Sequence, residues 1–372
     1  MTKLKVLTVI GTRPEIIRAS AIMKRFDELF DHTVVHTGQN YDFELNQIFF
    51  NELGLREPDY VLDSKSDNAF QQIGRLFSKL PEILDIEKPQ GFFVLGDTNS
   101  CLSAYVAKRY QIPIFHFEAG NRCFDQRVPE EVNRKIVDHL ADINLCYSRL
   151  SRDYLLAEGF PADRVFAVGS PMWEVIAQQK SKLDESRILD RFGLSVRQYI
   201  VLSLHREENV DSEIRLIQMV DVIKKLYERH PLPVVMSLHP RTKKNIKSFS
   251  VEIPDHVILT KPLGFHDYLR LQRDSFVVLS DSGTVNEEAS ILGFCALNLR
   301  DSHERPEAMI NAVVPMTGFD FDSIKTGIEI LLLRKNTSPE PVIEYRVPDV
   351  SMRVANFIIS YFRLVNRVVW HK

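Results

Sequence analysis

Residues 115–144 read FHFEAGNRCFDQRVPEEVNRKIVDHLADIN, and the order of elements in this stretch decides the fold class. An apolar strand ends at His116-Phe117 and is followed at once by a carboxylate, Glu118, and by a small-residue loop. An acid at the end of a buried strand is typical of the ligand-binding edge of a parallel α/β sheet. Pro129 then opens a helix, because its missing N–H would have no partner at the first helical position. The stretch therefore predicts strand, loop and helix of an α/β domain.

The predicted helix from Pro129 carries two acids in its first turn, where the helix dipole favours them. Glu131 is expected to be a solvated cap. Glu130 and Arg134 are one turn apart, and this spacing fits a functional site as well as it fits a surface ion pair. A buried face is expected from Val132, Ile136 and Leu140.

The strand, loop and helix order recurs along the whole chain. In the first half, strands are expected at residues 4–10, 32–36, 92–95, 112–117, 143–147 and 165–168. After a polar stretch at residues 178–197, the second half has expected strands at residues 199–204, 233–238, 257–259, 276–280 and 295–299. This alternation predicts two doubly wound parallel sheets, and two such sheets imply a cleft between them. The spacing of apolar residues in 351–370 predicts a final amphipathic helix.

Length and composition set broad limits on function. A chain of 372 residues exceeds what one hydrophobic core usually serves, so two domains are expected. The net charge of -3 gives no electrostatic case for nucleic acid or an anionic membrane as a partner, and no apolar run approaches the ~20 residues of a membrane span. The four cysteines lack paired spacing, which argues against a disulfide frame or a zinc site and favours a cytoplasmic protein.

Charged residues follow three strand ends in the first half: Arg13, Asp97 and Glu118. A lone Asp in a Gly-Asp-Thr turn is usually a turn residue or a helix cap. Two acids and an arginine at one sheet edge instead predict a site. If Glu130 joins them, mutual repulsion and burial would raise the pKa of at least one carboxyl group and suit it to acid or base catalysis near neutrality.

The second half has its own polar strand ends. His205 opens the loop HREEN, which alone would be read as an ordinary polar loop. The strand at 276–280 runs through Ser282-Gly283-Thr284 into a helix, and free N–H groups at such a helix start suit a phosphate. Glu288, one turn inside, is either a ligand for sugar hydroxyls or an ordinary helix acid. Neither Gly-x-Gly-x-x-Gly after the first strand nor a Walker motif occurs, so a nicotinamide cofactor and P-loop hydrolysis have no support.

Taken in order, these segments resemble the non-hydrolysing UDP-N-acetylglucosamine 2-epimerase family over nearly the whole chain. The matching motifs are GTRPE at 11–15, GDT at 96–98, HFEAG at 116–120, PEEVNR at 129–134, HREEN at 205–209, DSGTVNEEA at 281–289 and RDSHERPE at 300–307. The resemblance implies two Rossmann-like domains of the glycosyltransferase-B type, at residues 1–175 and 176–350, with a helix at 351–372 packing back on the first. It also implies a homodimer that binds a UDP-sugar and needs neither metal nor redox cofactor.

The family's functional residues carry over by position. The resemblance implies catalytic roles for Asp97, Glu118, Glu130 and His205. It implies contacts with the UDP-sugar for Arg13, Arg134, Ser282, Gly283, Thr284, Glu288 and Arg305, and places Tyr268 near the uracil.

The sequence departs from the commonest pattern of the family at several positions. Arg18 replaces a lysine, Asn121 replaces an apolar residue, and the loop 123–128 is shortened. The stretch EAGNRCFDQRVPEE looks like the branch that converts UDP-2-acetamido-2,6-dideoxy-L-talose to UDP-N-acetyl-L-fucosamine for capsule or O-antigen. The segment TGQNYDFE at 37–44 only partly matches the region that binds an activating UDP-sugar in some members.

Four other functions stay open at this point: a UDP-N-acetylglucosamine 2-epimerase that makes UDP-N-acetylmannosamine, a hydrolysing epimerase, a UDP-sugar glycosyltransferase, and a catalytically silent nucleotide-sugar binding protein.

Overall fold

The computed structural model describes residues 3–38, 43–64, 66, 68–238, 240–302, 305–335 and 341–372. Residues 39–42 of the segment TGQNYDFE lie outside the described residues, as do His303 and Glu304. The chain forms two compact units. The first comprises Met1–Gln178 and Glu344–Lys372, and the second comprises Gln179–Ile343.

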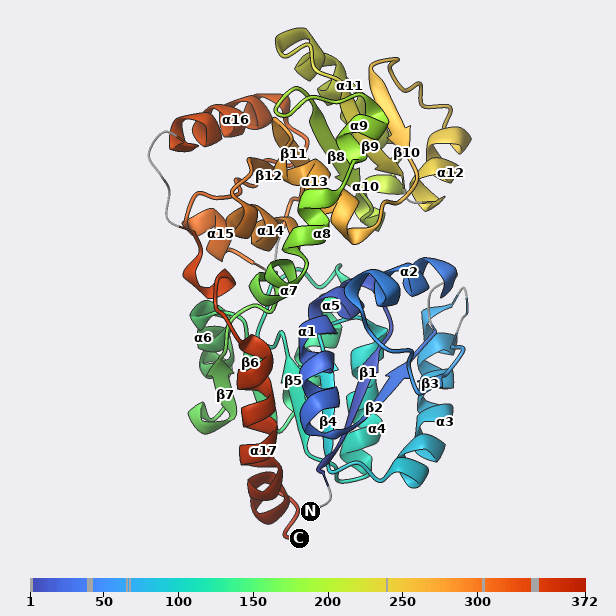
Figure 1. The fold of residues 1–372 in the computed structure, drawn as a ribbon, viewed down its shortest axis with the longest axis vertical. Helices are drawn as coiled ribbons and strands as arrows, with labels where there is room; N and C mark the ends of the chain where they lie inside the picture. The colour runs from blue at the N-terminus through green and yellow to red at the C-terminus, as the bar shows by residue number, and fades with distance from the viewer. Residues whose placement is uncertain are drawn as a thin grey trace. The chain divides into compact units, whose positions relative to one another are not determined.

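The first unit is built on a parallel sheet with the strand order β3-β2-β1-β4-β5-β6-β7 (Figure 1). Its strands are β1 (Lys5–Ile10), β2 (Asp31–His36), β3 (Tyr60–Val61), β4 (Gly91–Leu95), β5 (Ile114–Phe117), β6 (Ile143–Cys146) and β7 (Val165–Ala167). All residues of β4, β5 and β6 are buried, as expected for parallel strands with helices on both faces. The order reverses between β1 and β4, and the doubly wound sheet predicted from the sequence is confirmed.

The helices of the first unit occupy the connections between these strands. They are α1 (Arg13–Leu29), α2 (Phe43–Leu53), α3 (Ala69–Glu87), η1 (Asn99–Leu102), α4 (Ser103–Arg109), α5 (Pro129–Leu140), α6 (Arg149–Ala157), η2 (Ala162–Arg164), α7 (Met172–Gln178) and α17 (Val350–Val368). Helix α1 buries Ile16, Ala19, Met23 and Phe26, the spacing that the sequence predicts.

Helix α17 returns the chain to the first unit and packs against α1. It buries Val354, Ile358 and Phe362 at helical spacing. Its start is fixed by Glu174 of α7, whose carboxylate accepts hydrogen bonds from the Ser351 N–H at 2.9 Å and the Ser351 hydroxyl at 2.6 Å.

The second unit has a parallel sheet with the order β10-β9-β8-β11-β12. Its strands are β8 (Ile200–Leu204), β9 (Val234–Leu238), β10 (Val257–Thr260), β11 (Val277–Ser280) and β12 (Ala296–Asn298). Its helices are α8 (Lys180–Glu185), α9 (Ile188–Phe192), α10 (Glu207–Val210), α11 (Glu213–Arg229), α12 (Pro240–Ser248), α13 (Phe265–Arg273), α14 (Val285–Leu292), α15 (Glu307–Ile310) and α16 (Phe321–Lys335), and the 3-10 turn η3 (Ile343–Tyr345) follows. The strand order reverses between β8 and β11.

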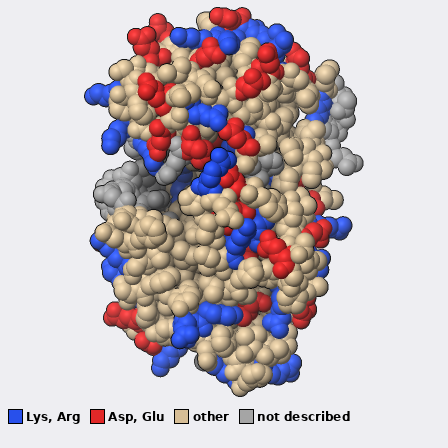
Figure 2. Space-filling model, turned by 180° about the vertical axis from the view of Figure 1, so that it is seen from behind, with Lys and Arg blue, Asp and Glu red and all other residues tan. Residues whose placement is uncertain are grey.

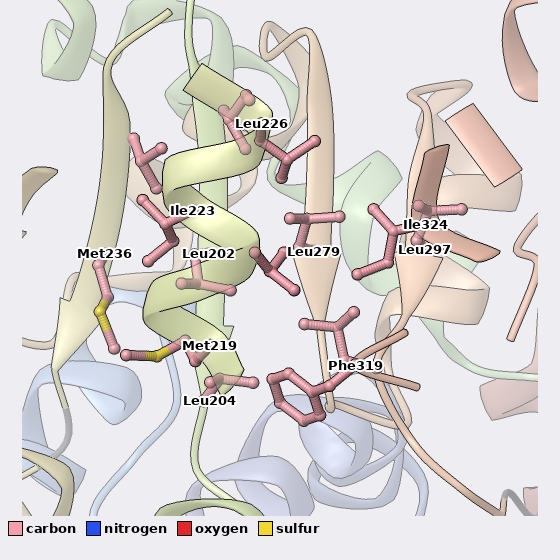
Figure 3. Packing of buried hydrophobic residues seen from close by; sticks show 14 of the residues in the cluster. Leu202, Leu204, Met219, Ile223, Leu226, Met236, Leu279, Leu297, Phe319 and Ile324 are labelled. Atoms are coloured by element: carbon pink, nitrogen blue, oxygen red, sulfur yellow. The ribbon is translucent and has the colours of Figure 1, made fainter. Parts of the chain in front are cut away.

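The core of the second unit lies between its sheet and α11. Figure 3 shows Leu202 of β8 and Leu279 of β11 beside Met219 and Ile223 of α11, while Leu297 of β12 lies farther along the sheet. All five side chains are at most 2% exposed. This packing holds β8 and β11 side by side, and so fixes the loops that follow them.

The surface carries charges of both signs. On the face shown in Figure 2, lysine and arginine side chains are interspersed with aspartate and glutamate, in keeping with a net charge of -3. Among the described helices, none combines the length and the apolar character that a bilayer crossing requires.

Candidate active site

Three predicted site residues follow adjacent strands of the first sheet, at the place between β1 and β4 where the strand order reverses. Asp97 follows β4 and Glu118 follows β5, and these strands are paired with Leu95 opposite Phe117. Arg13 opens α1 directly after β1, the other neighbour of β4. Ligands of doubly wound sheets bind at this edge, so the structure brings these three residues to the expected place.

Glu118 is held in an unusual backbone conformation. Its φ of 72° lies in the left-handed region, although it is not a glycine. Its N–H donates to the Leu145 carbonyl at 3.0 Å, and its side chain is buried. A non-glycine residue in this region costs on the order of 1–3 kcal/mol, and such strain concentrates at functional sites.

The Glu118 carboxylate is surrounded by donors. Arg18 Nη1 lies 2.6 Å from its Oε2, and this pair is almost fully buried. The Asn121 amide donates to Oε1 at 3.4 Å, and the Tyr147 hydroxyl donates to Oε2 at 3.5 Å. These donors stabilise an ionised carboxylate. Arg18 and Asn121, two of the departures from the family pattern, therefore both contact Glu118.

Gly96 allows the carboxylate to lie this close to the β4 loop. Its φ is +74°, and a Cβ at this position would lie 3.3 Å from Glu118 Oε2. Because Asp97 is the next residue, the absence of a side chain at Gly96 lets the loop that carries Asp97 lie close to Glu118.

Helix α5 supplies the partners of Asp97. Arg134 Nε donates to Asp97 Oδ2 at 2.7 Å, and the Asn133 amide donates to the Asp97 carbonyl at 2.9 Å. Arg134 also contacts Glu131, whose Oε2 lies 2.8 Å from Arg134 Nη1. Glu130 is half-buried in the first turn of the same helix, one turn before Arg134.

The predicted orientation of α5 is wrong. Glu131, expected to be a solvated cap, is fully buried, whereas Val132 and Ile136, expected to be buried, are 45% and 43% exposed. The reason is that α5 packs its polar side on the loop before it. The Glu131 carboxylate accepts hydrogen bonds from the backbone N–H groups of Cys123 and Phe124, both at 3.1 Å, and so fixes this loop.

Glu15, which the sequence did not single out as a candidate, holds two loops together at this edge of the sheet. It is buried on α1, and its Oε2 accepts from the backbone of Gly11 and Thr12. Its Oε1 accepts from the hydroxyls of Thr98 and Ser100. Burial raises the pKa of Glu15, although these hydrogen bonds lower it in part. The residue ties the loop after β1 to the loop after β4, and the Thr-x-x-Glu spacing of a capping box at 12–15 is the signal that could have identified it.

In the second unit, the reversal point brings His205 and Asp281 together. Asp281, at the end of β11, accepts from the backbone N–H groups of His205 and Arg206 and from the Asn209 amide, at 3.0 to 3.2 Å. His205 Nδ1 lies 3.0 Å from Asp281 Oδ1, and the histidine side chain is 46% exposed. Burial raises the pKa of Asp281, but the His205 charge and these hydrogen bonds outweigh it and lower the pKa to about 2. Asp281 is thus an ionised partner that orients His205.

The Ser282–Thr284 turn leads into α14. The Ser282 N–H donates to Ser280 Oγ at 3.0 Å, and the Thr284 N–H donates to Ser282 Oγ at 3.3 Å. The prediction of free N–H groups is therefore wrong for these two residues, because neighbouring hydroxyls satisfy them. Arg305 Nη1 donates to the Gly283 carbonyl at 3.0 Å and also contacts Glu287, so this arginine braces the turn.

Two further predicted residues lie in the same unit. Glu288 is buried on α14, and Tyr268 is half-buried on α13. Within the part of the chain that the structure describes, no group of three His, Cys, Asp or Glu side chains is arranged to hold a metal ion.

Comparisons with known proteins agree with this arrangement. Residues 24–359 match the family model described as UDP-N-acetylglucosamine 2-epimerase. The structure of UDP-N-acetylglucosamine 2-epimerase from Rickettsia bellii is 42% identical and has a TM-score of 0.91, with 100% of each chain covered. The Methanocaldococcus jannaschii UDP-GlcNAc 2-epimerase, solved in complex with UDP-GlcNAc and UDP, is 32% identical with a TM-score of 0.89, covering 96% of this chain and 100% of its own.

A relative with a different sugar is about as similar in sequence. The UDP-2,3-diacetamido-2,3-dideoxy-D-glucuronate 2-epimerase of Pseudomonas aeruginosa is 36% identical over 327 residues, which cover 86% of this chain and 90% of the relative. Because the family match extends over most of the sequence and the likeness to solved structures includes both units, this chain belongs to the UDP-N-acetylglucosamine 2-epimerase family.

Proposed function

We propose that the chain inverts C2 of a UDP-2-acetamido sugar by eliminating UDP to a 2-acetamidoglycal and then adding UDP back. That the chain is a UDP-sugar 2-epimerase follows from its family; the reaction course is the proposal. The observation that carries it is Glu118, whose backbone is strained and whose buried carboxylate is paired with Arg18 beside the Gly96-Asp97 turn. Strain of this kind persists only where the surrounding structure enforces it.

The chemistry requires both a base and an acid. The hydrogen on C2 is not acidic by itself, because no carbonyl is conjugated to it. Its removal becomes feasible when the C–H electron pair forms the C1–C2 double bond while UDP leaves with the C1–O pair. A proton then returns to the opposite face of C2 and UDP re-adds at C1. Asp97, Glu118 and Glu130 share these duties, and Asp97 and Glu118 are each paired with an arginine, Arg134 and Arg18.

The second unit supplies groups for the UDP leaving group. Asp281 holds His205 through Nδ1, and as an imidazolium the ring can also donate from Nε2 to a diphosphate oxygen. Arg13, Arg305 and the hydroxyls of Ser282 and Thr284, with Gly283 allowing close approach, add stabilisation of the developing charge, an electrostatic contribution worth about 3–4 kcal/mol per well-placed donor. Tyr268 is assigned to the uracil and Glu288 to sugar hydroxyls.

For the sugar, we propose UDP-2-acetamido-2,6-dideoxy-L-talose, with UDP-N-acetyl-L-fucosamine as the product for surface polysaccharide. The support is the short loop 123–128, which Glu131 fixes, and Asn121, whose amide reaches Glu118 while its Oδ1 accepts from the Ser151 hydroxyl at 2.9 Å. UDP-N-acetylglucosamine is the second candidate, favoured by the likeness to the Rickettsia bellii and Methanocaldococcus jannaschii enzymes.

The test is NMR of a panel of UDP-2-acetamido sugars in D₂O with the full chain. Deuterium entering at C2 of one sugar, with UDP retained, identifies both reaction and substrate. Free UDP formed in step with the epimer would instead show a hydrolysing enzyme. Absence of deuterium from every sugar would contradict the proposal and leave a glycosyltransferase or a binding protein. We expect a cytoplasmic homodimer, and light scattering measures the oligomeric state.

A further inference from the structure

His116 is a fully buried polar residue in the middle of the first sheet, and none of the steps above uses it. It lies on β5, two residues before Glu118 and opposite Val94 of β4. Its ring makes one contact from each nitrogen. Nε2 lies 2.9 Å from the Gly96 carbonyl oxygen, and Nδ1 lies 2.9 Å from Asp138 Oδ1 of α5.

We infer that His116 is a positioning residue that carries a proton on both ring nitrogens and, as an imidazolium, fixes the Gly96-Asp97 turn against Glu118. The inference rests on the proposed function for its catalytic consequence. Its structural part, the protonation state, stands on the contacts alone.

The donor and acceptor roles of the two contacts decide the protonation state. A backbone carbonyl can only accept, so Nε2 must carry a hydrogen. Nδ1 faces the Asp138 carboxylate, which also accepts hydrogen bonds from two other groups. Arg122 Nη1 donates to Asp138 Oδ2 at 2.7 Å, and the Gly120 N–H lies 3.3 and 3.4 Å from the two carboxylate oxygens. A neutral imidazole has only one N–H. Its other ring nitrogen, an acceptor, would then face a second acceptor, either the Gly96 carbonyl or the Asp138 carboxylate.

Asp138 has donors other than the histidine, Arg122 Nη1 at 2.7 Å and the Gly120 N–H, and these favour the ionised carboxylate. Burial raises the pKa of Asp138, and the Arg122 guanidinium is among the contacts that outweigh burial and lower it. An ionised Asp138 cannot donate to Nδ1. The second proton therefore belongs to the histidine.

The charges around His116 balance. Arg122 continues the chain of contacts to Glu158, with Nε and Nη2 at 2.8 and 2.7 Å from its two oxygens. Two cations, His116 and Arg122, thus face two anions, Asp138 and Glu158. A buried charge is tolerable only when it is paired and hydrogen-bonded, and each buried member of this cluster meets that condition.

The cluster acts on the site through Gly96. The Gly96 N–H donates to the Phe117 carbonyl at 2.9 Å, while the Gly96 carbonyl accepts from His116, so both polar backbone groups of Gly96 are held by β5. Asp97 follows directly, and Glu118 Oε2 lies 3.3 Å from the position that a Cβ of residue 96 would take. Fixing Gly96 therefore fixes the separation of the two acids.

Histidine 15N NMR of the full chain tests the protonation state, and the chain offers a matched control. His32 also contacts a carboxylate through Nδ1, at 2.7 Å from Asp27, but its Nε2 lies 2.8 Å from the Thr8 hydroxyl, which can donate or accept. One proton suffices there. Burial lowers the pKa of His32, an effect that the Asp27 contact offsets only in part.

At about pH 8.5, some two units above the ordinary histidine pKa of ~6.5, we expect two protonated ring nitrogens for His116 and one for His32. The signals are assigned by their loss in His116→Gln and His32→Gln. If His116→Gln does not fold, the spectra of His32→Gln and His205→Asn leave His116 as the carboxylate-paired histidine that persists in both. A singly protonated His116 overturns the inference.

Kinetics test the positioning role. Glutamine at 116 keeps an N–H for Gly96 but carries no charge for Asp138, so His116→Gln should lower kcat by roughly 10- to 100-fold, the scale of a misplaced catalytic group, with KM within about twofold. His32→Gln should leave both unchanged. A His116→Gln enzyme that folds and turns over at the rate of the unmutated enzyme would contradict the role. Failure of the unmutated chain to exchange deuterium would instead reject the proposed function while leaving the NMR result standing.

Discussion

Replacing Gly96 by alanine tests whether the spacing of the two acidic loops limits turnover. The backbone at this position has φ +74°, where alanine costs about 1–2 kcal/mol. The added Cβ would also lie 3.3 Å from Glu118 Oε2, closer than ordinary van der Waals contact, so the carboxylate must move by a few tenths of an ångström. Glu118 has little room to do so, because Arg18 holds the same oxygen at 2.6 Å.

The expected size of the effect follows from that displacement. A misplacement of about 1 Å costs roughly 10²-fold in rate, so a shift of a few tenths should lower kcat by about three- to tenfold. KM should change less, because the contact involves an acid assigned to the chemical step. The unfolding free energy should fall by about 1–2 kcal/mol from the backbone term alone.

Gly193→Ala is the matched control for Gly96→Ala. Gly193 ends α9 with φ +62°, and a Cβ there would meet no atom within 4 Å. The control should therefore lose a similar unfolding free energy in urea titration and keep its kcat in the deuterium-exchange assay. If both variants lose turnover equally, or if neither does, the contact between residue 96 and Glu118 does not set the rate.

Further predictions concern the carboxylates. Glu118→Gln and Asp97→Asn keep shape and remove charge, so each should cut kcat by orders of magnitude in the exchange assay while UDP still binds by calorimetry; near-normal turnover would remove that residue from the mechanism. The pKa of Asp281 lies at about 2 in the fold against an ordinary 3.8, so its ionisation stabilises the fold above about pH 4, and roughly 2 kcal/mol should be lost as the pH falls toward 2. Urea midpoints of Asp281→Asn should show a weaker acid dependence over that range, and an unchanged dependence would contradict the assignment. Glu15→Gln should cost little, because its amide can donate to the Thr98 and Ser100 hydroxyls, whereas Glu15→Leu should cost about 1–3 kcal/mol for each backbone N–H left without an acceptor in urea titration.

The sequence predicted the sheets well because their strands are apolar runs between polar loops. The expected strand at 92–95 is β4 (Gly91–Leu95), and the expected strand at 199–204 is β8 (Ile200–Leu204). The orientation of α5 failed for the opposite reason. An apolar side chain was taken to mark the buried side, yet Glu131 is buried there with two backbone N–H groups and Arg134 as partners, while Val132 is exposed. Hydrophobic periodicity cannot detect burial of a charge that finds its partners only in the fold.

Part of the candidate site could be predicted from the sequence. The rule that ligands bind at the carboxyl ends of strands predicts Asp97 and Glu118 as candidates, because strand ends can be read from the sequence, and the structure places both after paired strands. The side chains that pair with these acids in the fold could not be predicted from the sequence. Arg18 and Glu118 are 100 residues apart, and His205 and Asp281 meet only because β8 and β11 are neighbours in the sheet. The partners depend on strand order, which the alternation of elements does not specify.

In each of the two units, a buried carboxylate holds together the loops that follow two neighbouring strands. In the first, Glu15 accepts backbone N–H groups from the loop after β1 and hydroxyls from the loop after β4. In the second, Asp281 at the end of β11 accepts backbone N–H groups from the loop after β8. Both carboxylates lie where the strand order reverses, and both tie together the two loops that diverge there. Glu15 and Asp281 thus accept hydrogen bonds from backbone N–H groups. Asp97 and Glu118, two acids that we propose act on the substrate, are instead each paired with the side-chain guanidinium group of an arginine from another element.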